Sequence, residues 1–328
     1  MNLSISHLSS RSISVAQEFG PRWRRAQSWV RSLVLVWIFA VLAAPLSAVL
    51  AENYQPFVLA DRNAGSDPAA VASTLANRLS EGGFRVLATT SPAPQAVVVV
   101  ATHDDLLKIA AATPRGGYIA PIRISATLVD GAVQVAYTDP EYFRVAYSGT
   151  GSAVAVRDRL AAILGRDATF GATDMDEARL SRYRYAFGME RFTDPMELGS
   201  FPSHQHAFGT VTNRLAAREG GVSEIYRLQI PGTEQVVIGV AIREADGAPR
   251  DADDRYNLTT VDIDVLRHTA YLPYEILING RQVEALHMRY RMALHFPDLR
   301  MMGGDASFMA LRRSPDAVMQ ALTTAVSQ

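Results

Sequence analysis

The chain has no cysteine among its 328 residues, and this absence excludes several kinds of chemistry at once. Disulfides, thiolate metal ligands, thiol nucleophiles and a lipid anchor on an N-terminal cysteine are all ruled out. Lysine is almost absent too, since Lys108 is the single lysine and arginine supplies every other basic side chain. The three tryptophans all lie before residue 51. Stability of the remaining chain must therefore come from packing.

The first 51 residues differ in composition from the rest of the chain. Four arginines between residues 22 and 31 precede an uncharged run at residues 32–50, and small residues before Glu52 match a signal-peptidase site. We expect residues 1–51 to be a signal peptide. The alternative is an uncleaved N-terminal membrane anchor, because about 19 apolar residues can cross a bilayer. Both interpretations predict an exported, periplasmic protein, held at the inner membrane only if residues 32–50 are retained.

Length and net charge indicate how many domains the chain forms and which partners are disfavoured. A hydrophobic content of 48% over this length can bury a sizeable core and fits about two domains. The net charge is −1, and the leader holds five arginines but one glutamate, so the exported part is acidic. An acidic surface argues against nucleic acid as a partner. We expect contact with a membrane only through the N-terminal segment.

Three features of the exported part occur twice in the same order: a segment ending in Glu-Gly-Gly, an apolar run and a turn dipeptide. They are residues 75–84, 97–101 and Asp130-Gly131, and then residues 211–222, 236–241 and Asn279-Gly280. We therefore expect a first copy of one module at residues 52–165 and a second, divergent copy at 183–328. Residues 166–182, where charge rises and periodicity fades, are the expected linker.

Both copies predict the order strand, helix, four strands, helix. In the first copy, Asp67 caps a helix, and Asp130-Gly131 is a strong two-residue hairpin signal. In the second copy we expect an opening strand near residues 183–192, a loop at 244–257 and a long hairpin at 265–296, followed by a helix from residue 306. The pattern predicts an α+β fold of two tandem antiparallel sheets, each with its helices on one face.

Part of the first copy resembles a known bacterial family. Residues 118–123 (YIAPIR), the Asp130-Gly131 turn and residues 135–142 (VAYTDPEY) are similar to the family called domain of unknown function 302. The resemblance covers residues 54–165 well and 183–328 more loosely. It implies an α+β fold with a curved sheet like that of the TATA-binding protein, sometimes in tandem copies, and it implies no established reaction.

The second hairpin carries the main candidate site. With Asn279-Gly280 as its two-residue loop, the strand register would place six polar side chains on one uncovered face. They are Asp264, His268, His287, Arg289, Arg291 and His295. Such a face would suit a small anionic ligand. The alternative is a solvated face of cross-strand charge pairs, each contributing about 0.2–1 kcal/mol. The matching face of the first copy carries Arg123, Ser125, Thr127, Gln134 and Thr138.

A metal site is the second hypothesis, and no other cofactor is expected. His204, His206 and the pair Met301-Met302 are ligand types that suit copper. The two histidines are weak candidates, because residues two apart at the start of a helix diverge.

No catalytic motif stands out in the sequence. We therefore expect a binding or accessory protein of the cell envelope without catalysis, whose partner is a small anionic ligand or another envelope protein. Duplication favours a monomer in which the sheets of the two copies form a pseudo-dimer. The competing hypothesis is a periplasmic copper-type protein, or an enzyme, that uses the histidines and arginines of the second sheet.

Overall fold

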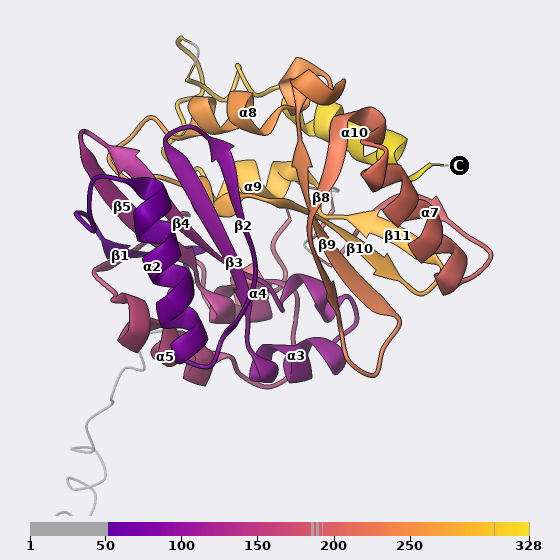
Figure 1. Cartoon of the computed structure of the whole chain (residues 1–328), viewed down its shortest axis with the longest axis horizontal. Coiled ribbons are helices and arrows are strands. Elements are labelled where there is room, and N and C mark those ends of the chain that lie inside the picture. Colours follow the sequence, from indigo (N-terminus) through magenta and orange to yellow (C-terminus); the bar gives the residue numbers. More distant parts are fainter. Residues whose placement is uncertain (1–51, 185–186, 188–189, 192, 305, 328) are drawn as a thin grey trace, which may run out of the picture. The chain divides into compact units, whose positions relative to one another are not determined.

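Two antiparallel sheets and their helices make up the described part of the chain (Figure 1). The computed structural model describes residues 52–328 except 185–186, 188–189, 192, 305 and 328. These residues belong to one compact unit, and the predicted α+β class is confirmed. The expected signal peptide or anchor lies outside the described residues. Of the helices within them, none has the length and apolar character needed to cross a membrane.

The first copy forms a sheet with the order β2-β3-β4-β5-β1-β6. Its elements are β1 (Phe57–Asp61), α2 (Pro68–Glu81), β2 (Arg85–Ala93), β3 (Ala96–Thr102), α3 (Asp104–Ala111), η1 (Gly116–Tyr118), β4 (Ile122–Val129), β5 (Ala132–Thr138), α4 (Pro140–Ala146) and α5 (Val154–Leu164). The segment expected to be a linker contributes β6 (Ala168–Phe170), which pairs with β1, and α6 (Glu177–Leu180). This segment therefore extends the first sheet.

The second copy forms a sheet with the order β7-β11-β10-β9-β8. Its elements are β7 (Met196–Ser200), α7 (His204–Ala216), η2 (Glu219–Gly221), β8 (Val222–Gln229), β9 (Gln235–Ile242), η3 (Glu244–Asp246), η4 (Arg250–Ala252), α8 (Asp254–Val261), η5 (Thr269–Tyr271), β10 (Tyr274–Asn279), β11 (Gln282–Ala285), α9 (Met288–Leu294) and α10 (Ser314–Val326). Read from β8, the order repeats the order β2-β3-β4-β5-β1 of the first sheet.

Several expectations for the second copy were wrong in detail. The segment at 244–257 is not a loop, because it folds into two short 3-10 turns and the start of α8. Asp253 caps that helix by accepting a hydrogen bond from the Tyr256 N–H at 2.9 Å. The strand in the opening position is β7, while half of the strand expected near 183–192 lies outside the described residues. The last helix begins at Ser314 rather than at residue 306. The helix α8 occupies the chain position that α3 has in the first copy.

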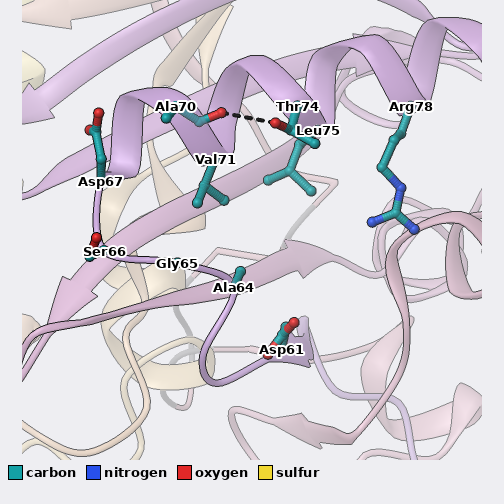
Figure 2. A pocket seen from close by; sticks show the side chains of 10 residues that line it. All are labelled: Asp61, Ala64, Gly65, Ser66, Asp67, Ala70, Val71, Thr74, Leu75 and Arg78. Carbon is teal, nitrogen blue, oxygen red and sulfur yellow. Dashed lines mark hydrogen bonds between the residues drawn. The ribbon is translucent and has the colours of Figure 1, made fainter.

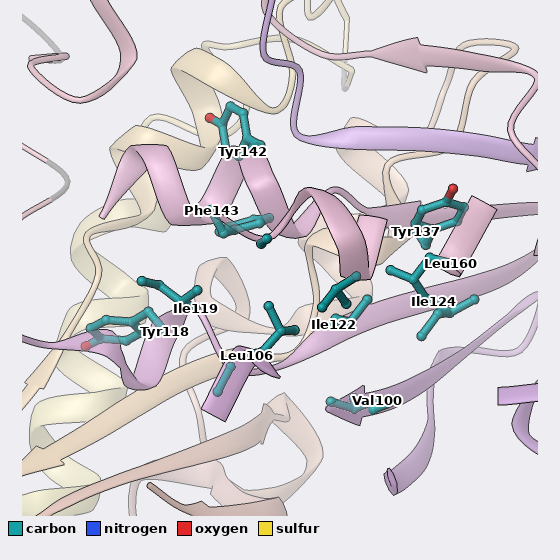
Figure 3. Packing of buried hydrophobic residues seen from close by; sticks show 14 of the residues in the cluster. Val100, Leu106, Tyr118, Ile119, Ile122, Ile124, Tyr137, Tyr142, Phe143 and Leu160 are labelled. Carbon is teal, nitrogen blue, oxygen red and sulfur yellow. The ribbon is translucent and has the colours of Figure 1, made fainter. Parts of the chain in front are cut away.

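The two sheets bury each other's polar faces. Helices α2 and α5 pack on one side of the first sheet, while η5 of the second copy packs on β4 and β5. In return, η1 of the first copy packs on β9 and β10. Both apolar clusters contain residues from both copies. Figure 3 shows the larger one, where Leu106, Tyr118, Ile122 and Phe143 gather from α3, η1, β4 and α4. The face expected to be open is therefore covered.

Candidate functional site

The predicted ladder of histidines and arginines does not form, because the second hairpin is shorter than expected and has another register. Asn279 pairs with Gln282, which leaves Gly280 and Arg281 as the loop. Gly280 has a φ of +59° at the first loop position, where a type II′ turn requires glycine. The strand β11 ends at Ala285, and the chain then turns into α9. The predicted site residues beyond this point lie on a helix.

Three of the six predicted site residues lie apart from the rest. Asp264 is exposed in the bend between α8 and η5. His287 caps α9, where its Nδ1 accepts a hydrogen bond from the Arg289 N–H at 3.0 Å. The Arg289 guanidinium lies 3.5 Å from the carboxylate of Asp316. These contacts are local, so the prediction that these residues share one open face was wrong.

The other three, His268, Arg291 and His295, do come together, but they are buried between the sheets. Arg291 lies 3.6 Å from the carboxylate of Glu275 on β10. Arg123 on β4 donates to the same carboxylate, and its Nε donates to the Ala270 carbonyl at 3.1 Å. We call Arg123, Glu275 and Arg291 the buried lock. It joins the central strands of the two sheets.

Arg123 and Glu275 occupy equivalent positions in the two copies. Each is the second residue of its strand, and each follows a proline, Pro121 or Pro273, by two residues. In a pair of identical copies related by a two-fold axis, a residue on that axis would meet its own copy. Here the two positions carry opposite charges and form an ion pair. The two copies are therefore complementary at this contact and not interchangeable.

The lock holds two guanidinium groups for one carboxylate, and aromatic groups surround the surplus positive charge. The Arg123 guanidinium lies 4.9 Å from the ring centre of Phe143, and that of Arg291 lies 4.3 Å from the ring centre of Tyr274. The Tyr226 hydroxyl donates to Glu275 at 3.1 Å. A buried ion pair adds little net stability, yet removal of one partner typically costs about 3–5 kcal/mol. We therefore expect the lock to fix how the two sheets fit rather than to add net stability.

A second group of polar contacts fixes η1 on the second sheet. Arg115 lies 3.0 Å from the carboxylate of Glu284, and the Tyr118 hydroxyl donates to the Glu284 carbonyl at 3.2 Å. The Gly117 N–H donates to Oε1 of Gln235 at 3.0 Å. Burial raises the pKa of Glu284, and the nearby Arg115 guanidinium opposes that rise. From the sequence alone, the polar side chains in these contacts would be expected to face water.

The rings of the buried histidines lie against aromatic side chains. The rings of His268 and His295 lie 5.8 and 5.2 Å from that of Phe57. Within the described residues, their ring nitrogens make no hydrogen bond, and His268 Nδ1 lies 3.7 Å from Asp262. Burial, reinforced by Arg291, lowers the pKa of His295 well below its ordinary value. His295 is thus a neutral packing residue at pH 7.

The weaker metal candidates also have local roles. His204 lies at the start of α7, with its Nδ1 3.3 Å from the Gly280 carbonyl, and exposed His206 lies 3.4 Å from the Thr210 hydroxyl. Across the part of the chain that the structure describes, no three His, Asp or Glu side chains form a group that could hold a metal ion.

An open groove lies at the seam between the copies. It has a volume of about 490 Å³ and is formed by residues 91–94, at the end of β2 and the start of the following turn, together with Arg243, Glu244, Ala245, Asp253 and Arg255. Arg243 bridges the seam, because its Nη2 donates to the Ser91 carbonyl at 3.0 Å. Arg255 is exposed, and its guanidinium has no hydrogen bond or ion pair with another described residue. Glu244 is exposed as well, and its carboxylate has no hydrogen bond or ion pair with another described residue. The groove therefore presents an unpaired cation and an unpaired anion beside the fixed Arg243.

Asp254 supports the wall of this groove from inside the protein. Its Oδ2 accepts from the Ile242 N–H at 2.9 Å and lies 3.2 Å from Arg243. Burial raises the pKa of Asp254 to about 7, and Arg243 limits the rise. The contact fixes α8 against the end of β9 and orients Arg243 toward the first copy.

A second recess, of about 380 Å³, lies beside the beginning of α2 (Figure 2). Its polar groups mostly stabilise that helix. Asp67 accepts from the backbone N–H two residues further on at 2.9 Å, and the Thr74 hydroxyl donates to the Ala70 carbonyl at 3.1 Å. Arg78 donates to the Ile163 carbonyl of α5. These are capping and helix-packing contacts, as the sequence predicts for Asp67.

Sequence reasoning missed Glu275, Asp254 and Arg255. One signal for Glu275 was present, because aligning Pro121 with Pro273 places opposite charges at equivalent positions of two apolar strands. No comparable signal marked Asp254 and Arg255, which lie in the segment taken for a loop.

Comparison with family models, curated proteins and solved structures finds no match for this chain. The resemblance to domain of unknown function 302 therefore stays a prediction that rests on the residues quoted above.

Proposed function

We propose that this chain is an exported protein of the cell envelope that binds a small anionic ligand or a partner protein without catalysis. The groove at the seam carries the proposal, because an unpaired Arg255 guanidinium and the fixed Arg243 both line it. Guanidinium groups offer forked donors that match carboxylate and phosphate oxygens. The ligand class is thus a small carboxylate or phosphate.

The charge balance of the groove supports a small ligand over an extended one. Both oxygens of Asp253 accept backbone N–H bonds, from Glu244 at 2.8 Å and Tyr256 at 2.9 Å, which compensates its negative charge. Arg243 shares its charge with Asp254. Arg255 then carries the free positive charge of the groove and Glu244 its free negative charge, so a small ligand has to place its anionic group at Arg255 and away from Glu244.

The proposal includes a monomeric pseudo-dimer produced by duplication of one module. The shared strand order and the reciprocal packing of η1 and η5 support a two-fold relation between the copies. The lock opposes pairing of either copy with a second molecule of itself. Two first copies would bring Arg123 against an arginine, and two second copies would bring Glu275 against a glutamate. We expect a monomer in sedimentation equilibrium, and a stable dimer would contradict this part of the proposal.

Ligand binding can be tested with citrate and inorganic phosphate as probes, titrated into the chain from residue 52 onward by calorimetry. We expect Arg255→Gln to weaken binding of the better probe by about tenfold, or about 1.4 kcal/mol, as for one charge-assisted hydrogen bond. The matched control is Arg159→Gln on α5, an exposed arginine outside the groove. Equal affinities for Arg255→Gln and wild type, or no anion binding at all, would reject the groove.

We do not extend the proposal to a copper protein or an enzyme that uses the second sheet. That hypothesis needs His268, His287 and His295 on one open face. His287 instead caps α9, and the other two are buried against Phe57.

A further inference from the structure

One loop of the second copy presents an unusual set of exposed side chains. Among the described residues, six large apolar side chains are exposed, and three of these are methionines of the loop between α9 and α10. Their exposed fractions are 69% for Met301, 77% for Met302 and 46% for Met309. The other three, Phe187, Ile263 and Val265, lie outside this loop. Three thioethers thus gather on one short segment that does not bury them.

Backbone hydrogen bonds and two apolar side chains attach this loop to the rest of the protein. The Phe308 N–H donates to the Arg300 carbonyl at 2.7 Å, and the Met309 N–H donates to the Met301 carbonyl at 3.3 Å. Leu311 is fully buried in the second apolar cluster, and Phe308 packs against that cluster. The backbone of Met309 therefore lies directly against that of Met301, with Met302 next in sequence. Methionine has three rotatable side-chain bonds, so an exposed thioether can turn toward a shared ion.

The chemistry of these side chains is specific. A thioether is a soft, neutral donor, and soft sulfur ligands suit monovalent copper rather than hard ions such as Mg²⁺ and Ca²⁺. The chain has no cysteine, so its only sulfur donors are methionines. A surface that only had to be apolar could use leucine or phenylalanine as well, yet all three exposed positions here carry sulfur.

We propose that Met301, Met302 and Met309 form a binding site for a soft monovalent cation of the Cu(I) and Ag(I) class. The three thioethers supply a trigonal set of ligands. This site is independent of the groove at the seam, and its failure would leave the anion-binding proposal unaffected. Because thioethers carry no proton, binding should not change between pH 7.5 and 5.5, whereas binding to imidazoles falls over that range.

The test uses Ag(I), a redox-stable probe, added as the nitrate in chloride-free buffer to the chain from residue 52 onward. Native mass spectrometry should show one tightly bound silver ion per chain, and the three methionine methyl signals should shift together in a ¹³C NMR titration. Met301→Leu/Met302→Leu/Met309→Leu keeps the apolar bulk but removes the sulfur. We expect this variant to lose at least tenfold in silver affinity and to keep its melting temperature.

Two control variants make the outcome decisive. Met319→Leu changes a buried methionine of α10 and should bind silver as wild type does. His204→Asn/His206→Asn removes the competing imidazoles and should also retain the ion. Loss of silver from the histidine variant, full binding by the triple leucine variant, or movement of fewer than three methyl signals would each overturn the proposal.

Discussion

The two copies share one strand order but carry different side chains where they meet. In the first copy, β4 brings a buried arginine to the contact, and in the second copy β10 brings a buried glutamate to the same position. The turn η1 brings Gly117 against the second sheet, whereas η5 brings Thr269, whose hydroxyl bonds to that of Thr127 at 2.8 Å. The two surfaces are therefore complementary at these contacts. A repeat of one fold can thus become a single specific unit.

The copies also differ in the segment that follows β3 in the first copy and β9 in the second copy. The helix α3 of the first copy is short and buries Leu106, Leu107 and Ile109. The corresponding segment of the second copy is longer and polar, and it builds one wall of the seam groove. In the first copy this segment therefore packs into the core, and in the second copy it forms part of the surface of the groove. The difference locates the proposed ligand site in the second copy.

The largest expected effect comes from breaking the buried lock on its acidic side. Glu275→Gln leaves the guanidinium groups of Arg123 and Arg291 buried without their carboxylate, so we expect the free energy of unfolding to fall by about 3–5 kcal/mol. Urea denaturation of the chain from residue 52 onward measures this loss.

The same lock should respond less to a change on its basic side. Arg123→Met leaves Glu275 with Arg291 and with the Tyr226 hydroxyl. We therefore expect a smaller loss than for Glu275→Gln, since a charged group that keeps a partner avoids most of the penalty. Equal losses, or a larger loss for Arg123→Met, would show that Glu275 does not serve both arginines.

The next effect tests how closely η1 fits the second sheet. A Cβ added at Gly117 would lie 2.5 Å from Cδ1 of Leu277, so Gly117→Ala should cost about 1–3 kcal/mol through overpacking. Adding Leu277→Val removes the clashing methyl group and should recover part of the loss. Thermal unfolding of the single and double variants decides the point, and an additive loss in the double variant would exclude this clash as the cause.

Acid should loosen the contact between the copies through His295. Its pKa is lowered in the folded state, so the unfolded chain, with a pKa near 6.5, binds the proton more readily. Stability is then complete above about pH 7 and falls as the pH drops toward 5, by up to about 1.4 kcal/mol per pH unit. His295→Leu should flatten this slope. Urea midpoints at four pH values compare the two proteins, and parallel curves would mean that the pKa of His295 is the same in the folded and unfolded states.

Much of the first copy could be predicted because local signals agree with the fold. Asp67 and Pro68 mark the start of α2, and Asp130-Gly131 fixes a hairpin in which Val129 pairs with Ala132. Both loop residues have positive φ, as a type I′ turn requires. Such signals act within a few residues, so a sequence can show them directly.

The candidate site could not be predicted because it depends on what covers each face. Alternating polar residues on β4 indicate an exposed face when one sheet is considered alone. In the structure, Thr127 and Gln134 instead bond to Thr269 and Val265 of the other copy. The register of the second hairpin was also hard to predict. Glycine is accepted at either position of a two-residue loop, so Gly280 can be its first or its second residue, and a shift of one residue in strand pairing moves each side chain to the opposite face of the sheet.

The smallest expected effect compares the first helix of each copy. Aligning the repeated segments places Gly209 of α7 opposite Ser73 of α2, so the second copy alone has a glycine at this helical position. A Cβ added at Gly209 would meet no atom within 4 Å. Gly209→Ala should therefore raise the free energy of unfolding by about 0.5–1 kcal/mol, since alanine loses less backbone entropy in a helix. A loss of stability in urea denaturation would instead mean that the side of α7 around Gly209 is in contact with another part of the chain.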